Sequence, residues 1–304
     1  MTESQANPTV AAVAVKPERV GFSLHRVWII GLNTFTESMR QKVFNILLVF
    51  ALVAIGSASF FTEFTFSVQL KFIKDFCLGA MSVFGTLIAI VGTAQLLPSE
   101  LENRTIYTIL AKPVRRMEFI LGKYTGAAML LFLSVLVMSV MTGVVLKFKE
   151  ARLIADARQV VQESVSPEDR AIAGQDLAQI QAETRDTDMV KAVILVFVKL
   201  SLLAAITLLI STMSTSMIFT VAVAFMVFFA GHLRSTAAEA WAQHKLWLAL
   251  LAIIPDLSAF NVADDINLGN LIPWQHVGLV AVDGLGRIVM ILVATHLIFE
   301  KREI

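Results

Sequence analysis

The chain has 304 residues, of which 57% are hydrophobic and 16% are charged, and its formal net charge is +1. Since soluble globular domains are about one-quarter charged, this composition predicts a membrane protein. The nearly neutral charge, without a basic stripe, gives no support for nucleic-acid binding. A single cysteine, Cys77, excludes an intrachain disulfide framework and a cysteine-based zinc site.

The N-terminal region precedes the first long apolar run. Residues 1–21 contain an apolar core that is too short for a signal peptide and that follows Glu3 rather than basic residues, so we expect a disordered cytoplasmic tail. Residues Phe22 to Phe44 combine aromatic and aliphatic side chains with basic flanks, a pattern typical of a helix lying in the membrane interface. The pattern leaves open whether this helix is only a local anchor or has an active role.

Six apolar runs are long enough, or nearly so, to cross a bilayer, whose hydrocarbon core of about 30 Å requires about 20 helical residues. They lack the alternation of β-barrel strands, so we expect helices. The predicted fold is therefore all-α, a polytopic membrane protein with six transmembrane helices. The expected spans are residues 43–61, 76–97, 124–146, 192–212, 217–233 and 276–299.

A further apolar run, Leu246 to Ile254, is interrupted by Pro255 and is too short to span the bilayer. It predicts a re-entrant or interfacial segment before the last helix.

Lysine and arginine residues gather in the flanks on the same side as the N-terminus, so the positive-inside rule places both termini in the cytoplasm. We therefore expect a multi-pass protein of the cell (cytoplasmic or inner) membrane. The connector of residues 147–191 then lies outside the cytoplasm, and its polar pattern predicts two helices. A solvated hairpin and a docking site for an extracytoplasmic partner both remain open.

Three ionisable side chains fall within the expected spans: Lys199, Asp283 and Arg287. Such residues are costly in lipid and are therefore candidates for a functional role. They predict either a polar lining of a translocation path or a buried charge pair, Lys199 with Asp283 or Asp283 with Arg287. Catalysis is disfavoured because the sequence lacks a phosphate-binding loop and the common hydrolase motifs. The five histidines are scattered and predict no metal site.

The loop between the second and third expected spans, Pro98 to Lys123, is cytoplasmic in this topology and rich in spaced charges. Leu101, Thr105 and Ile109 fall at i, i+4 and i+8, so they share one face of a short amphipathic helix. Pro113 would end that helix. A loop that served only as a connector would need no such stripe, and the helix offers a contact surface to a soluble partner.

This loop resembles the cytoplasmic loop that joins the second and third spans of ABC-2 type transporter permeases. Arg104 stands where the family often has glycine, and the segments IIPDLSAFNVADDI (Ile253 to Ile266) and IFEKREI also resemble the ends of these permeases. The shared loop residues are Glu100, Glu102, Thr105, Ile109, Leu110, Lys112, Pro113, Val114, Arg116, Glu118, Phe119, Gly122, Lys123 and Tyr124.

The resemblance implies that residues 22–304 form one ABC-2 type transmembrane domain, the permease subunit of an ATP-binding cassette exporter. It also implies a second permease copy or paralogue, and cytoplasmic ATP-binding subunits that bind the ATP, so that this chain is no enzyme and holds no cofactor. The substrate stays open. A coupling helix would contact the ATPase through Glu100, Leu101, Glu102, Arg104, Thr105 and Ile109.

Two other functions are compatible with six spans and an exposed loop. One is a non-transporting membrane scaffold or anchor of a multi-protein complex. The other is an intramembrane enzyme, which has only Lys199, Asp283 and Arg287 as candidate catalytic groups and no nucleophile arrangement. Association with an ATPase separates the transporter from both.

Because the sequence has no phosphate-binding loop, we predict that the purified chain alone neither binds nor hydrolyses ATP. Equilibrium binding of a fluorescent ATP analogue and phosphate release are the measurements. Saturable nucleotide binding by the partner-free chain would contradict the prediction.

Overall fold

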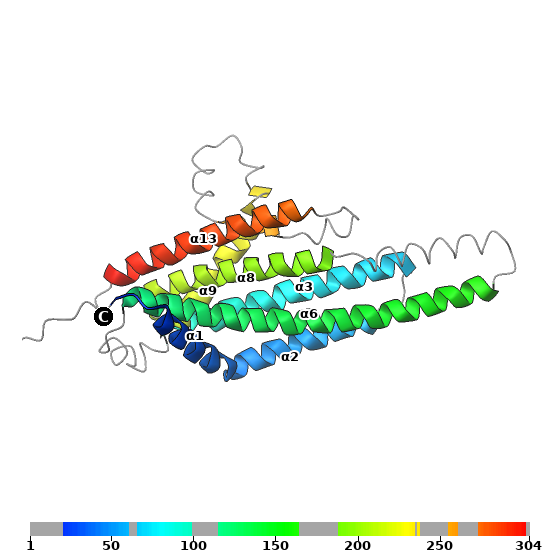
Figure 1. Ribbon diagram of the computed structural model, residues 1–304, viewed down its shortest axis with the longest axis horizontal. Coiled ribbons are helices and arrows are strands. Elements are labelled where there is room, and N and C mark those ends of the chain that lie inside the picture. The colour runs from blue at the N-terminus through cyan, green and yellow to red at the C-terminus, as the bar shows by residue number, and fades with distance from the viewer. Residues whose placement is uncertain are drawn as a thin grey trace, which may run out of the picture.

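The computed structural model describes residues 21–60, 66–98, 115–163, 188–234, 236–237, 255–260 and 273–301. Within these ranges the regular elements are all helical, and the long helices run side by side in an elongated bundle (Figure 1). The α-helices are α1 (Leu24–Met39), α2 (Lys42–Ser57), α3 (Phe66–Ala94), α6 (Arg116–Glu163), α8 (Asp188–Met213), α9 (Met217–His232) and α13 (Trp274–Lys301). Two short 3₁₀ turns, η1 (Ala58–Phe60) and η2 (Ser258–Phe260), complete the described elements.

Five of the described helices are long and apolar enough to cross a membrane: α2 with η1, α3, α6, α8 and α13. They coincide with five of the expected spans. The sixth expected span, residues 217–233, coincides with α9, a shorter apolar helix of 16 residues. At 1.5 Å per residue α9 is about 24 Å long, less than the hydrocarbon core of about 30 Å. The structure therefore supports a multi-pass membrane protein, and the count of six remains a prediction.

Two helix boundaries differ from those expected. The interfacial helix predicted over 22–44 ends at Met39, since Gln41 is extended with ψ 127°, and α2 begins at Lys42. The polar segment after Leu146 does not start a separate helix, because α6 continues unbroken to Glu163. With 48 residues α6 is about 72 Å long, more than twice the thickness of the hydrocarbon core.

Several expected elements lie outside the described residues. These are the N-terminal tail up to residue 20, the proposed coupling helix, the second half of the 147–191 connector from residue 164 to 187, and the segment Leu246 to Ile254.

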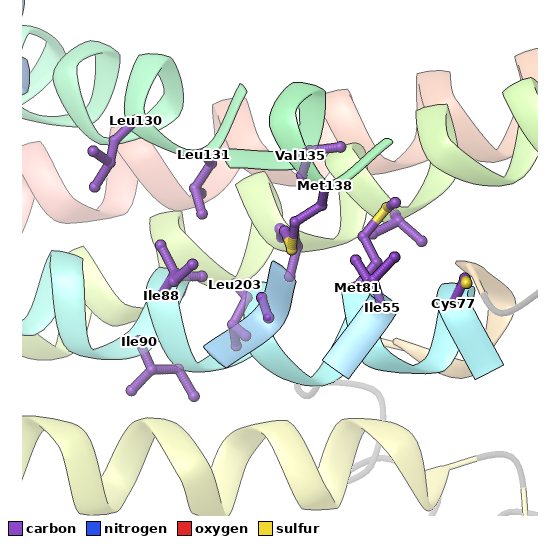
Figure 2. Close-up of a cluster of buried hydrophobic side chains, with 14 of the residues drawn as sticks. Ile55, Cys77, Met81, Ile88, Ile90, Leu130, Leu131, Val135, Met138 and Leu203 are labelled. Carbon is purple, nitrogen blue, oxygen red and sulfur yellow. The ribbon is translucent and has the colours of Figure 1, made fainter. Parts of the chain in front are cut away.

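Helix α8 forms the centre of the bundle and is the most buried of the five long apolar helices. It contacts α3, α6, α9 and α13, and it contributes side chains to both of the hydrophobic clusters in the described part of the chain. One cluster joins α8 to η2, α13 and the start of α6. The other joins α8 to α2, α3 and the middle of α6, and Figure 2 shows Met81, Ile88, Leu131 and Met138 of this cluster facing one another. Cys77 lies at its edge and is fully buried.

Helix α1 packs closely against the start of α6, and glycines make this possible. A Cβ atom built on Gly122 would lie 2.6 Å from Ile30 Cβ, and one built on Gly126 would lie 2.6 Å from Thr34 Cβ and 2.7 Å from the carbonyl oxygen of Gly31. Gly122 and Gly126 form a G-x-x-x-G pair, the spacing that lets two helix backbones approach in a membrane. The position of α1 therefore depends on these two small residues.

We predict that Gly126→Ala destabilises the protein by about 1–3 kcal/mol, because the added methyl group meets backbone and a β-branched side chain that cannot move away. Gly143→Ala on the same helix is the matched control, since nothing lies within 4 Å of its Cβ position. Thermal unfolding of the purified chain in detergent measures both variants. Equal melting temperatures would contradict the close approach of α1 to α6.

Candidate functional site

The residues predicted to contact a partner lie in the loop of residues 99–114, outside the described residues. They are Glu100, Leu101, Glu102, Arg104, Thr105 and Ile109. The described chain resumes at Arg115, directly before α6. The candidate site therefore consists of the residues around the point where the chain re-enters the bundle at Arg115. They lie at the end of the bundle where α1 begins, α6 begins and α13 ends (Figure 1).

Glu118 is the centre of this region. Its carboxylate is fully buried, and it accepts hydrogen bonds from the backbone N–H of Ser23 at 2.7 Å and of Arg115 at 3.1 Å. The guanidinium Nη1 of Arg26 forms an ion pair with Oε2 at 3.2 Å. The bond to Arg115 satisfies one of the free N–H groups at the start of α6, as the glutamate of a capping box does, and the negative charge suits the helix N-terminus. One carboxylate thus joins α1 to the point where the loop enters α6.

Arg116 joins the same region to the last helix. Its Nη1 donates hydrogen bonds to the carbonyl oxygens of Phe299 and Glu300, both at 2.9 Å. These carbonyls belong to the last turn of α13, where the helix itself supplies no donors. The rings of Phe119 and Phe299 stack with centroids 5.9 Å apart. We call the group of Ser23, Arg26, Arg115, Arg116 and Glu118 the Glu118 junction.

The residues that follow the junction connect α6 to its neighbours. Gly122 allows the close approach of α1 to α6, as described above. Lys123 is buried with its ammonium 5.8 Å from the ring centroid of Phe119, and the Tyr124 hydroxyl donates a hydrogen bond to the Ser201 carbonyl of α8 at 3.4 Å. The run E-F-x-x-G-K-Y therefore has a packing role at almost every position.

The sequence alone did not reveal the roles of Arg26 and Glu118. The sequence pattern indicates for Arg26 only a place in the basic flank of an interfacial helix. It indicates for Glu118 only a place in the motif shared with the permease loop. Their partnership spans 92 residues of sequence, which no local pattern can report. No capping-box signature pointed to this glutamate either, because Arg115 stands where that signature has Ser or Thr.

The three ionisable residues at membrane depth are placed in two separate groups. Lys199 is buried on α8, where its Nζ donates to Ser82 Oγ at 3.0 Å and lies 5.8 Å from the ring centroid of Phe228. Asp283 and Arg287 form an ion pair at 2.7 Å on α13. Of the two predicted pairings the structure therefore has the second.

This ion pair is not buried as predicted. The side chains of Asp283 and Arg287 are 58% and 29% exposed, because they lie on the side of α13 away from α8. The neighbouring Gly284 is the residue that contacts α8, and a Cβ atom there would lie 2.6 Å from Val198 Cγ1. Lys199 and Asp283 thus lie at a similar level of the bundle, as expected, but on different sides of the α8–α13 contact.

Within the part of the chain that the structure describes, no three histidine, cysteine, aspartate or glutamate residues gather as a metal site. The chemistry available at the Glu118 junction is hydrogen bonding and ion pairing between helices. Such an arrangement fixes the positions of the helix ends relative to one another.

We predict that Glu118→Gln lowers the free energy of unfolding by about 1–3 kcal/mol, because an amide offers one acceptor oxygen where the buried carboxylate uses two. Glu37→Gln is the control, since Glu37 is exposed on α1. Thermal unfolding in detergent compares the two variants. If both unfold at the wild-type temperature, the junction does not stabilise the bundle.

Comparison with known proteins identifies the family of the chain. The family model described as ABC-2 family transporter protein matches residues 28–303, from within α1 to beyond the end of α13. A search of curated proteins finds no match. The family match covers the loop, the junction residues Arg115, Arg116 and Glu118, and all five long apolar helices, and it confirms the resemblance inferred from the loop residues. The chain belongs to the ABC-2 transporter family and is a multi-pass membrane protein of that family.

Proposed function

We propose that the chain is the permease subunit of an ATP-binding cassette exporter, coupled to a separate cytoplasmic subunit that binds and hydrolyses ATP. The family match over residues 28–303 supports the permease role. In this proposal the chain holds no cofactor and performs no catalysis. Two permeases, identical or paralogous, span the lipid bilayer together, and neither contacts nucleic acid.

The observation that carries the proposal is the Glu118 junction. The loop of residues 99–114 enters α6 at Arg115, whose backbone N–H is bound by Glu118. Glu118 also accepts a hydrogen bond from Ser23 at the start of α1. Arg116, the residue after Arg115, donates to the end of α13. A displacement of the loop is therefore passed directly to three helices, which is the arrangement that coupling to an ATPase requires.

The proposed coupling helix lies in this loop. Leu101, Thr105 and Ile109 fill a cleft in the ATPase, while Glu100, Glu102 and Arg104 form charged contacts at its rim. The apolar residues then contribute most of the binding energy, since well-packed anchors usually cost more than rim charges when truncated.

The proposed topology places both termini and the Glu118 junction in the cytoplasm and makes α9 the sixth span of a domain covering residues 22–304. Arg26, Arg115 and Arg116 lie at this end of the bundle, as the positive-inside rule requires. The connector of residues 147–191 then lies outside the cytoplasm. The exposed apolar side chains of α1, including Trp28 and Ile29, suit a helix in the membrane interface.

Lys199, Asp283 and Arg287 are proposed to contribute to the translocation path. The exposed ion pair of Asp283 and Arg287 supports this, because charges facing lipid are costly and usually face water or another protein.

The coupling proposal is tested by Leu101→Asp and Ile109→Asp. Each places a charge on the apolar stripe, so we expect loss of ATPase co-purification and of substrate-stimulated hydrolysis, with unchanged membrane insertion. Arg104→Ala should weaken association less and make it more sensitive to salt. Pull-down of tagged chain from native membranes, followed by ATPase assays, provides the readout.

Asn103→Asp is the matched control, because it adds the same charge about 200° around the helix from Leu101. Full association by both stripe variants would show that the loop is not the coupling element. Equal loss in the Asn103 control would show that added charge, rather than the apolar stripe, disturbs the contact.

A further inference from the structure

A pocket of about 540 Å³ opens beside the Glu118 junction. It lies between Phe22, two residues before α1, the start of α6 and the last two turns of α13. Its walls are formed by Phe22, Arg115, Arg116, Met117, His296 and Glu300. The pocket is separate from the ion pair and the lysine at membrane depth.

The walls of the pocket favour an anion. Two arginines and one histidine face it, against a single carboxylate, Glu300. Arg116 lies beside the pocket and donates through Nη1 to the end of α13. The His296 side chain is partly exposed at the pocket, with its Nε2 4.0 Å from Glu300 Oε2 and its Nδ1 buried away from the open space. Arginine and histidine together form the donor set that binds phosphate groups.

The surroundings of the pocket are apolar. Phe22 is 47% exposed and Met117 is 39% exposed at the pocket itself. On α13, Val293 and Leu297 are about half exposed and flank His296 on the surface that continues along the helix. His296 lies within the last two turns of this membrane helix, at the depth where the hydrocarbon meets the headgroups. A ligand with a phosphate group and an attached apolar tail therefore matches both parts of the surface.

We propose that this pocket binds the phosphate-bearing headgroup of an anionic phospholipid, whose acyl chains begin along the exposed side chains of Val293 and Leu297 on α13. Basic pockets between membrane helices at the headgroup level are suited to such lipids. The headgroup bridges the first turn of α6 and the last turn of α13, next to the contacts of Arg116. The site does not depend on the transport activity proposed above.

The experiment uses the full purified chain in detergent after removal of bound lipid. Phosphatidylglycerol is titrated against the melting temperature, with phosphatidylcholine as the neutral lipid. We expect phosphatidylglycerol to raise the melting temperature in a saturable way, and phosphatidylcholine to have a much smaller effect. Removing one basic contact by Arg115→Gln or His296→Gln should weaken the apparent affinity about fivefold.

Two further variants make the result specific. Glu300→Gln removes the one carboxylate of the pocket and should strengthen binding of phosphatidylglycerol. Arg40→Gln removes an exposed arginine at the C-terminus of α1, outside the pocket, and should leave the affinity unchanged. Because Arg115, Glu300 and Arg40 are all exposed, these substitutions are not expected to prevent folding.

Equal stabilisation by the two lipids, or an equal loss of affinity in Arg40→Gln and Arg115→Gln, would overturn the proposal. Inorganic phosphate at millimolar concentration is tested last, both alone and in competition with phosphatidylglycerol. If phosphate alone gives the same saturable shift and competes with the lipid, the pocket is a site for a soluble anion rather than for a lipid.

Discussion

Burying a carboxylate is costly unless hydrogen-bond donors and positive charge compensate it, and this requirement organises one end of the bundle. Glu118 meets it with two backbone N–H groups and one guanidinium from α1 and from the start of α6. These contacts set the position at which α1 begins beside the start of α6. The close packing of Gly122 and Gly126 against α1 then follows along the same two helices. Arg116, at the start of α6, extends the connection to α13, so that the starts of α1 and α6 and the end of α13 meet at one place.

Several hydroxyl groups inside the bundle do not take part in such networks. Ser134, Thr142, Thr207 and Thr295 each donate to a backbone carbonyl four residues earlier in their own helix. This local bond satisfies the hydroxyl without a second helix. Contacts between helices therefore depend mainly on apolar packing, small residues and the few charged groups at the junction.

The sequence predicted the long helices well, because a membrane span is a local property of about 20 consecutive residues. It named Asp283 with Arg287 as one of two alternative buried pairs, and helical spacing does bring these two side chains together, although they are not buried. It did not predict that α6 continues past Leu146, since the change from apolar to polar side chains marks the bilayer surface and not the end of a helix. The contacts of Glu118 with Ser23 and of Lys199 with Ser82 were beyond prediction, because they join residues 95 and 117 positions apart.

Helix α6 is continuous over 48 residues, so its two ends are joined by a single long helix. Its first turn is held at the Glu118 junction, and its far end, at Glu163, lies about 72 Å away along a helix that is unbroken through its length. A tilt of about 5° at the junction would carry that far end sideways by about 6 Å, since the displacement grows in proportion to the length. The length of the helix would thereby convert a small tilt at one end into a larger displacement at the other end.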